Sequence, residues 1–119
     1  MIDKRLLGTW QSDRRRTFRD YVLPKKMTAA QRRRYKALFG KLIVRWTARF
    51  CFTQLDDSKW KDPYELIGRD SVSVVVRAYN EVFEETRLTQ VFFENNHYWF
   101  WTPWGSREFF RRIPHLRPE

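Results

Sequence analysis

Residues 42–53 read Leu-Ile-Val-Arg-Trp-Thr-Ala-Arg-Phe-Cys-Phe-Thr, an alternation that decides the fold class of the chain. One predicted face carries a run of apolar side chains: Leu42, Val44, Trp46, Ala48, Phe50 and Phe52. The opposite face carries Ile43, Arg45, Thr47, Arg49, Cys51 and Thr53. A period of two predicts a β-strand with one buried face. This run is longer than a usual strand of five or six residues, and such strands are expected in barrels and strongly coiled sheets.

A helix is predicted just before this strand, over about residues 28–39. The sequence Thr28-Ala29-Ala30-Gln31 fits a capping box, in which the Thr28 hydroxyl accepts from a backbone N–H and the Gln31 side chain reaches back. Good helix formers follow, and Gly40 stands where a left-handed residue would end the helix. Apolar side chains form a narrow stripe on this helix, and basic residues cover most of the rest.

Further short strands are predicted on both sides, and turn residues separate them. A first strand spans residues 6–13 and resumes at 17–21, and the later ones span 64–68, 71–79, 85–94, 97–102 and 107–113. Turn chemistry marks Asp56-Asp57-Ser58, Asp62-Pro63, Asn80-Glu81, Asn95-Asn96 and Pro103-Trp104-Gly105-Ser106. Consecutive strands with tight turns make an antiparallel meander, and closure removes its exposed edges. We therefore expect one mostly β domain over residues 1–119, an up-and-down barrel or strongly coiled meander of about seven to eight strands with one helix between the first and second.

Gly8-Thr9-Trp10 at the first strand resembles the Gly-x-Trp signature of the lipocalin and fatty-acid-binding (calycin) families. The resemblance implies that Trp10 plugs one end of a barrel and that an arginine from the last strand packs across its ring. The last strand offers Arg111 and Arg112, and an unknown register leaves the choice between them open. A guanidinium over an indole is a favourable cation–π contact. The predicted helix is similar in position to the helical lid of fatty-acid-binding proteins.

Composition and charge exclude some classes of protein and suggest a partner. Hydrophobic residues make up 42% and aromatic residues 18%, too much for a disordered chain, and no apolar run is long enough for a transmembrane helix. The first fifty residues carry 15 Lys and Arg against 3 Asp and Glu, whereas residues 51–106 carry 5 against 9. A basic half favours an anionic partner such as nucleic acid. The candidate polyanion-binding residues are Arg14, Arg15, Arg16, Arg32, Arg33 and Arg34.

Aromatic residues on the predicted strands are candidates for lining a ligand pocket inside the barrel. They are Trp46, Phe50, Phe52, Trp99 and Trp101, with Tyr98 and Phe100 in place of the last two if the register is shifted. An inward arginine, such as Arg45, Arg49 or Arg77, would meet a carboxylate, although the alternation opposes this for the first two. The leading hypothesis is a lipocalin-like protein that binds a small apolar or amphipathic molecule, an anionic one included. The alternatives are a polyanion-binding or nucleic-acid-binding module and an interaction protein whose barrel is filled by side chains.

Catalytic and cofactor chemistry finds no positive support in the sequence. His97 and His115 are the only histidines, and they belong to no cluster with the spacing of a metal site, so no metal and no cofactor is expected. Cys51 is the only cysteine, which excludes an internal disulfide and fits a reducing cytoplasm. The start of the chain leads to no apolar segment, so a secretory signal is not expected. We predict a cytoplasmic binding protein rather than an enzyme; ligand identity and oligomeric state stay open.

Overall fold

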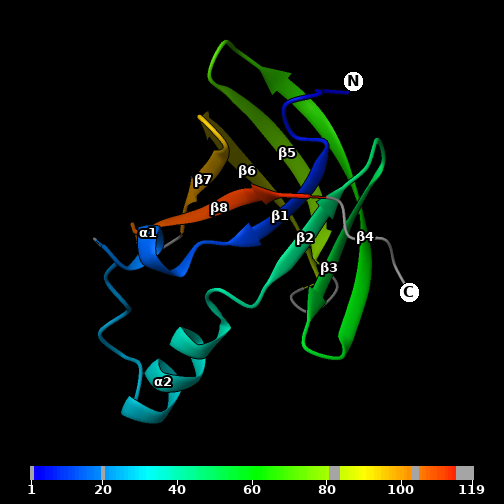
Figure 1. Cartoon of the computed structure of the whole chain (residues 1–119). Coiled ribbons are helices and arrows are strands. Elements are labelled where there is room, and N and C mark those ends of the chain that lie inside the picture. Colours follow the sequence, from blue (N-terminus) through cyan, green and yellow to red (C-terminus); the bar gives the residue numbers. More distant parts are fainter. Residues whose placement is uncertain (1, 20, 81–83, 103–104, 115–119) are drawn as a thin grey trace.

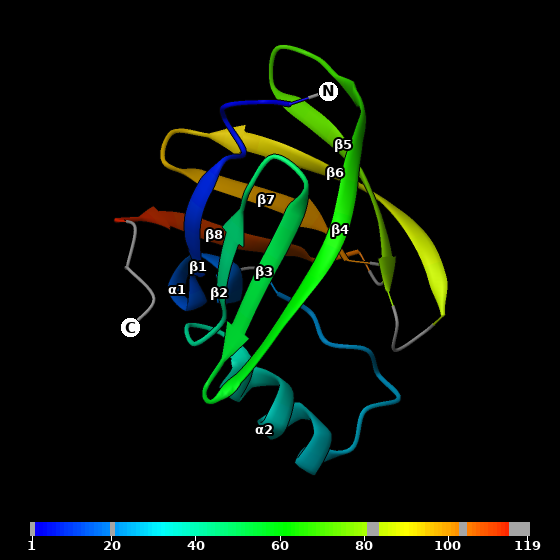
Figure 2. The ribbon, with the colours of Figure 1, turned by 90° about the vertical axis from the view of Figure 1, so that its right-hand side faces the viewer.

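The computed structural model describes residues 2–19, 21–80, 84–102 and 105–114 of the chain. Within them, the strands form a closed antiparallel barrel in which each strand pairs with its neighbours in sequence (Figures 1 and 2). The elements follow in the order β1 (Gly8–Ser12), α1 (Arg14–Phe18), α2 (Ala29–Leu38), β2 (Ile43–Trp46), β3 (Phe50–Leu55), β4 (Ser58–Arg69), β5 (Ser73–Asn80), β6 (Glu85–Glu94), β7 (His97–Trp101) and β8 (Arg107–Ile113). The predicted fold class is confirmed.

Closure of the barrel depends on one long-range ladder between β1 and β8. The two strands pair antiparallel, with Trp10 opposite Arg112 and Ser12 opposite Phe110. β1 also pairs with β2 on its other side, where Trp10 lies opposite Val44. Every described strand therefore has two neighbours, which leaves the sheet without the exposed edges of an open meander.

The predicted helix forms, with the expected signals at both ends. The Thr28 hydroxyl accepts from the Gln31 backbone N–H at 3.1 Å, and the Gln31 side chain accepts from the Thr28 N–H at 2.9 Å. This capping box satisfies two backbone donors that a helix start leaves unpaired. α2 ends at Leu38, and Gly40 follows with a φ of 89°, a left-handed conformation that glycine adopts without strain.

The long strand predicted over residues 42–53 is wrong, because the chain reverses within it. Residues 47–49 connect β2 to β3, and the Thr47 N–H donates to the Phe50 carbonyl at 2.9 Å. The Thr47 hydroxyl accepts from the Phe50 N–H at 3.2 Å, so a side chain completes the turn. Trp46 then lies opposite Cys51, and both belong to the barrel interior. The turn shifts the alternation by one residue, which places Phe50 and Phe52 on the outer face.

Two other local predictions are corrected. The resumed strand at 17–21 is wrong, because α1 occupies residues 14–18; the Asp13 carboxylate accepts from the Arg16 N–H at 3.0 Å and caps this helix. The turn at Asp62-Pro63 is also wrong, because both residues lie within the twelve-residue strand β4.

The turns at 56–57 and 95–96 are confirmed, with positive φ angles of 52° at Asp56 and 54° at Asn95. The predicted turns at Asn80-Glu81 and Pro103-Trp104 fall in part outside the described residues.

The two ends of the barrel differ. Figures 1 and 2 both place the N-terminal segment at the end where β4 turns into β5, with α2 at the opposite end. Arg5 fastens the N-terminal segment there, since its side chain binds the Asp3 carboxylate and donates to the Ser71 and Asp70 carbonyls at 3.0 Å. We call this the plugged end and the α2 end the mouth. Among the described helices, none has the length and apolar character needed to span a membrane.

Candidate functional site

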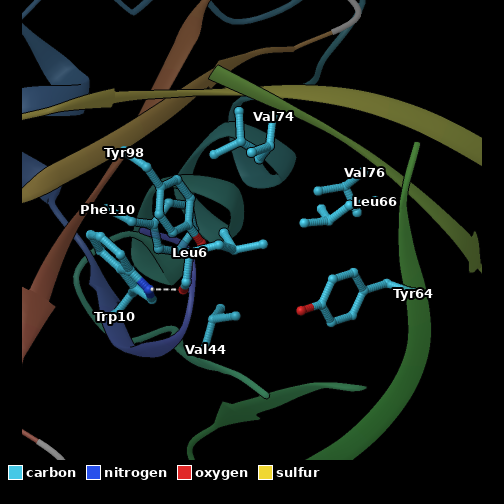
Figure 3. Packing of buried hydrophobic residues seen from close by; sticks show 10 residues of the cluster. Leu6, Trp10, Val44, Tyr64, Leu66, Val74, Val76, Tyr98 and Phe110 are labelled. Carbon is cyan, nitrogen blue, oxygen red and sulfur yellow. Dashed lines mark hydrogen bonds between the residues drawn. The ribbon is translucent and has the colours of Figure 1, made fainter. Parts of the chain in front are cut away.

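A tryptophan and an arginine close the plugged end. Trp10 is 1% exposed, and its indole N–H donates to the Leu6 carbonyl at 2.9 Å (Figure 3). The Arg112 guanidinium carbon lies 4.2 Å from the centre of the indole. Arg112 also donates to the Leu7 and Arg5 carbonyls, both at 2.8 Å. The register thus assigns the arginine that the sequence left open, and it is Arg112; Arg111 faces outward and donates to Gln11 at 2.7 Å.

Gly8 makes room for this contact. A Cβ atom at this position would lie 2.5 Å from Nη1 of Arg112, and the φ angle of Gly8 is 128°. Both facts exclude a larger residue without a shift of the arginine or the backbone. The glycine, tryptophan and arginine therefore form one structural unit at the plugged end.

On β5 and β7, burial of the inward-facing side chains decreases from the plugged end toward the mouth. Along β5, Val74 is 0% and Val76 is 3% exposed, whereas Ala78 is only half-buried. Along β7, Tyr98 is 2% exposed and Phe100 is half-buried. On β2, Val44 is buried, whereas Leu42 toward the mouth and Trp46 toward the plugged end are both half-buried. Figure 3 shows the packed side of this interior, where Leu6, Trp10, Tyr98 and Phe110 crowd together.

The predicted pocket residues divide between the two faces of the barrel wall. Trp46 faces inward, as expected, and its indole N–H donates to the Tyr98 hydroxyl at 3.3 Å. Phe50 and Phe52 face outward. There the Lys61 Nζ atom lies 4.5 Å from the ring centre of Phe50, and the Arg45 guanidinium carbon lies 4.3 Å from the ring centre of Phe52.

The aromatic strand β7 takes the second of the two registers considered. Tyr98 and Phe100 belong to the interior, since Tyr98 lies opposite Phe110 and Phe100 packs against the buried cluster. Trp99 and Trp101 therefore point outward, contrary to the pocket expected for them. Residues 98–101 of this strand are all large and aromatic, so these four residues offered no polar face to decide between the registers.

A carboxyl group and two tyrosines meet at the mouth. Glu108 follows the inward alternation of β8, and its carboxylate accepts from the Tyr35 hydroxyl at 2.9 Å and from the Tyr21 hydroxyl at 3.3 Å. Tyr35 belongs to α2, and Tyr21 belongs to the segment before it. Burial raises the pKa of Glu108, although both tyrosine hydrogen bonds oppose the shift. The sequence did not predict these three residues as part of the pocket. Only the alternation of inward and outward residues along β8 could have indicated Glu108.

Cys51 is another titratable group on the inner face. Burial raises the pKa of its thiol to about 12, so the thiol is protonated at neutral pH. Its sulfur lies 3.9 Å from the Thr53 hydroxyl. A protonated thiol is a weak nucleophile, and Cys51 thus acts as a small apolar side chain of the barrel wall.

The candidate polyanion-binding arginines lie on two separate helices. The first run is in α1, beside β8, and the second is in α2, at the mouth (Figure 1). Arg16 pairs with Glu94 at 3.2 Å, and Arg32 donates to the Pro24 and Met27 carbonyls at 3.3 Å. The exposed members are Arg14, Arg15, Arg33 and Arg34.

None of the three arginines considered for an inward position faces the interior. Arg45 packs on the outer face, and Arg77 pairs with Glu65 across the outer face of β4 and β5. Arg49 is exposed at the turn that connects β2 to β3.

Among the described residues, the one histidine is not part of a metal site. His97 lies 3.0 Å from the Asp13 carboxylate, and His115 lies outside the described residues. The described part of the chain holds no group of three or more His, Cys, Asp or Glu side chains placed to bind a metal.

Fold and site together define an eight-stranded antiparallel barrel with one plugged end and one mouth. No protein-family model matches the chain, and neither a curated protein nor a solved structure matches it significantly.

The raised pKa of Glu108 leads to a prediction about pH. A carboxyl whose pKa is higher in the folded than in the unfolded state stabilises the fold below the unfolded value, about 4.3, and this contribution is lost as pH rises through the folded value. We expect the Glu108→Gln variant not to lose stability in this way as pH rises, because glutamine does not titrate. The difference in melting temperature, wild type minus variant, should decrease from pH 4 to pH 8. Glu65→Gln, at an exposed outer carboxylate, is the control; an equal pH trend in both variants would refute the assignment.

Proposed function

We propose that this protein binds a small apolar or amphipathic molecule inside the barrel. The molecule would enter through the mouth beside α2. The observation that supports this most directly is the decrease in burial from the plugged end to the mouth, seen along β5 and β7. Half-buried apolar side chains at the mouth offer an apolar ligand surface area to cover, while the plugged end is already packed. These side chains are Leu42, Ala78 and Phe100.

The polar group of such a ligand would meet Glu108 and the tyrosines. Among the described residues, the inner face carries the Glu108 carboxyl group and two tyrosine hydroxyls toward the mouth, whereas Arg45 and Arg77 lie on the outer face. A carboxylate ligand would be repelled by ionised Glu108, whereas an amine or a hydroxyl could share its hydrogen bonds. The proposal therefore favours a cationic or neutral polar group over an anionic one.

The lipocalin-like character is part of the same proposal. It is supported by the contact of Trp10 with Arg112, by the glycine that admits this contact, and by the helix between β1 and β2. Some small barrels are filled by their own side chains. A binding experiment must therefore be able to show that this barrel takes no ligand, as expected of an interaction protein.

A neutral fluorescent probe, N-phenyl-1-naphthylamine, tests the proposal on the wild-type protein. Ala78→Trp places a large side chain in the half-buried interior and should weaken probe binding by at least about tenfold. Leu88→Trp adds the same group at an outer position that is 63% exposed and should leave binding within about twofold. Circular dichroism verifies that each variant keeps its strands, and Phe100→Ala, which widens the mouth, gives a second measurable change in affinity.

Competitors of equal chain length separate the ligand classes. Dodecylamine and dodecanol should displace the probe better than dodecanoate does. The absence of probe binding to the wild type, or equal losses in both tryptophan variants, would overturn the proposal and favour a filled barrel. Native mass spectrometry of freshly purified protein would then show no bound small molecule.

A further inference from the structure

The outer wall of the barrel carries a cleft that is separate from the interior. It has a volume of about 440 Å³ and lies between α1 and the hairpin of β7 and β8. Its lining consists of Arg16, Thr17, Trp101, Gly105, Ser106, Arg107 and Phe109. Alternation along β8 turns Phe109 away from the interior residues Glu108 and Phe110, so the barrel wall separates this cleft from the proposed pocket. The volume is within the usual range for small-molecule sites.

Aromatic rings hold two arginines at this cleft. The Arg107 guanidinium carbon lies 5.1 Å from the ring centre of Trp99 and 5.2 Å from that of Phe109. The Arg16 guanidinium carbon lies 4.9 Å from the same Phe109 ring, which is only 4% exposed. Stacked guanidiniums keep their N–H groups directed outward in the ring plane, where they can donate to an anion. Two cations thus share one buried ring at the floor of the cleft.

The charges at the cleft are only partly neutralised. Arg16 pairs with Glu94 at 3.2 Å. No carboxylate of the described residues forms an ion pair with Arg107, although three aromatic rings surround it. The hydroxyls of Thr17 and Ser106 already serve the fold, since they bind the backbone of Phe109 and Val22. The donors that remain for a ligand therefore come mainly from the guanidinium of Arg107.

An exposed aromatic face stands beside these donors. Trp101 is 56% exposed, contributes to the cleft lining, and lies 5.8 Å from the guanidinium carbon of Arg107. Its ring meets the ring of Trp99 edge-on, with centres 5.7 Å apart, and Trp99 stacks in turn on Phe92 at 4.3 Å. Neighbouring rings thus brace Trp101 and leave much of its surface to solvent. A planar ring can stack on such a surface while its anionic group reaches Arg107.

We propose that this cleft binds a nucleotide, with the phosphate at Arg107 and Arg16 and the base stacked on Trp101. A nucleotide joins a planar ring to a phosphate at the short separation that the lining provides, and its size suits the cleft volume. A base inside a duplex has no free face for Trp101, so the source is a free nucleotide or one unit of a single strand. A flat anionic membrane would not use the recess. The inference is independent of the pocket inside the barrel.

Fluorescence anisotropy with a labelled seven-residue thymidine oligonucleotide tests this inference. An abasic oligonucleotide with the same number of phosphates should bind at least about fivefold more weakly, because it offers nothing to stack. Arg107→Ala should weaken binding of the thymidine strand by about tenfold, whereas Arg77→Ala, an equal charge change elsewhere on the outer face, should have an effect below about threefold. Trp101→Ala should weaken it by at least about fivefold, and Trp60→Ala, at a 45% exposed tryptophan, should not.

Three further comparisons show whether the ligand is a free nucleotide or part of a single strand, and which results would contradict the proposal. Thymidine monophosphate that binds as tightly as the oligonucleotide assigns a free nucleotide, and much tighter binding of the oligonucleotide assigns a single strand. Equal binding of the abasic strand, or equal losses in the Arg107 and Arg77 variants, would overturn the proposal in favour of general attraction to polyanions. Binding to phosphatidylserine vesicles without binding to either nucleotide form would also overturn it. Neither result bears on the naphthylamine experiment, which reports on the interior.

Discussion

Replacing Trp10 with alanine is expected to lower the free energy of unfolding by about 3–5 kcal/mol. The side chain is 1% exposed, donates to the Leu6 carbonyl and meets the ring of Tyr98 edge-on at 4.7 Å. Its removal would leave a cavity between the N-terminal segment and the barrel and would leave the Leu6 carbonyl without its partner. Urea denaturation followed by circular dichroism measures the loss.

Trp60 provides the matched control for this substitution. It is 45% exposed on β4, and its replacement with alanine should cost less than about 1 kcal/mol. Trp10→Phe should give an intermediate loss of about 1–3 kcal/mol, because it keeps an aromatic ring but gives up the hydrogen bond and part of the buried area. Equal losses for the alanine variants of Trp10 and Trp60 would contradict the role of the plug.

Removing the arginine that covers Trp10 is the second large effect. Arg112→Ala should lower the free energy of unfolding by about 1.5–3 kcal/mol, since it deletes two charge-assisted hydrogen bonds and a cation–π contact. Arg112 is exposed, so water replaces part of what is lost, which favours the lower half of that range.

Arg111→Ala removes the same charge from the neighbouring position on the outer face. Its side chain is exposed and donates to Gln11, so we expect a loss below about 1 kcal/mol. Chemical denaturation of the two variants at equal salt makes the comparison. A larger loss at Arg111 than at Arg112 would mean that the register between β1 and β8 is wrong.

The parts of the fold that could be predicted are those set by local chemistry. The capping box at Thr28 and Gln31 uses contacts within four residues, so the sequence alone fixes the start of α2. The turn at Asn95 needs a residue that tolerates positive φ, and its own side chain supplies that property.

The turn at residues 47–49 could not be predicted in the same way. Its residues are Thr, Ala and Arg, with no glycine, proline or asparagine to mark a reversal, and the apolar alternation continues across it. Pairing between β2 and β3 and the hydrogen bonds of Thr47 determine it instead. One undetected turn was enough to move Phe50 and Phe52 from the expected pocket to the outer face.

The candidate sites depend on contacts that are even further apart in sequence. Glu108 meets Tyr35 across 73 residues, and Thr17 accepts from the Phe109 N–H across 92. No local pattern reports such a meeting, so the mouth and the outer cleft emerged only from the three-dimensional arrangement. The choice between Arg111 and Arg112 had the same cause, because strand register is a property of two strands and not of one.

The pairing of β1 with β8 affects how the chain is made. During synthesis, Thr9 leaves the ribosome long before Ile113, its partner in the ladder, has been added. Until then the first strand keeps one unpaired edge, and its large indole lacks the guanidinium that covers it, a state in which nascent chains associate with one another. The earliest strand to emerge is thus among the last to be secured, and folding should wait for the closing strand rather than proceed as translation does.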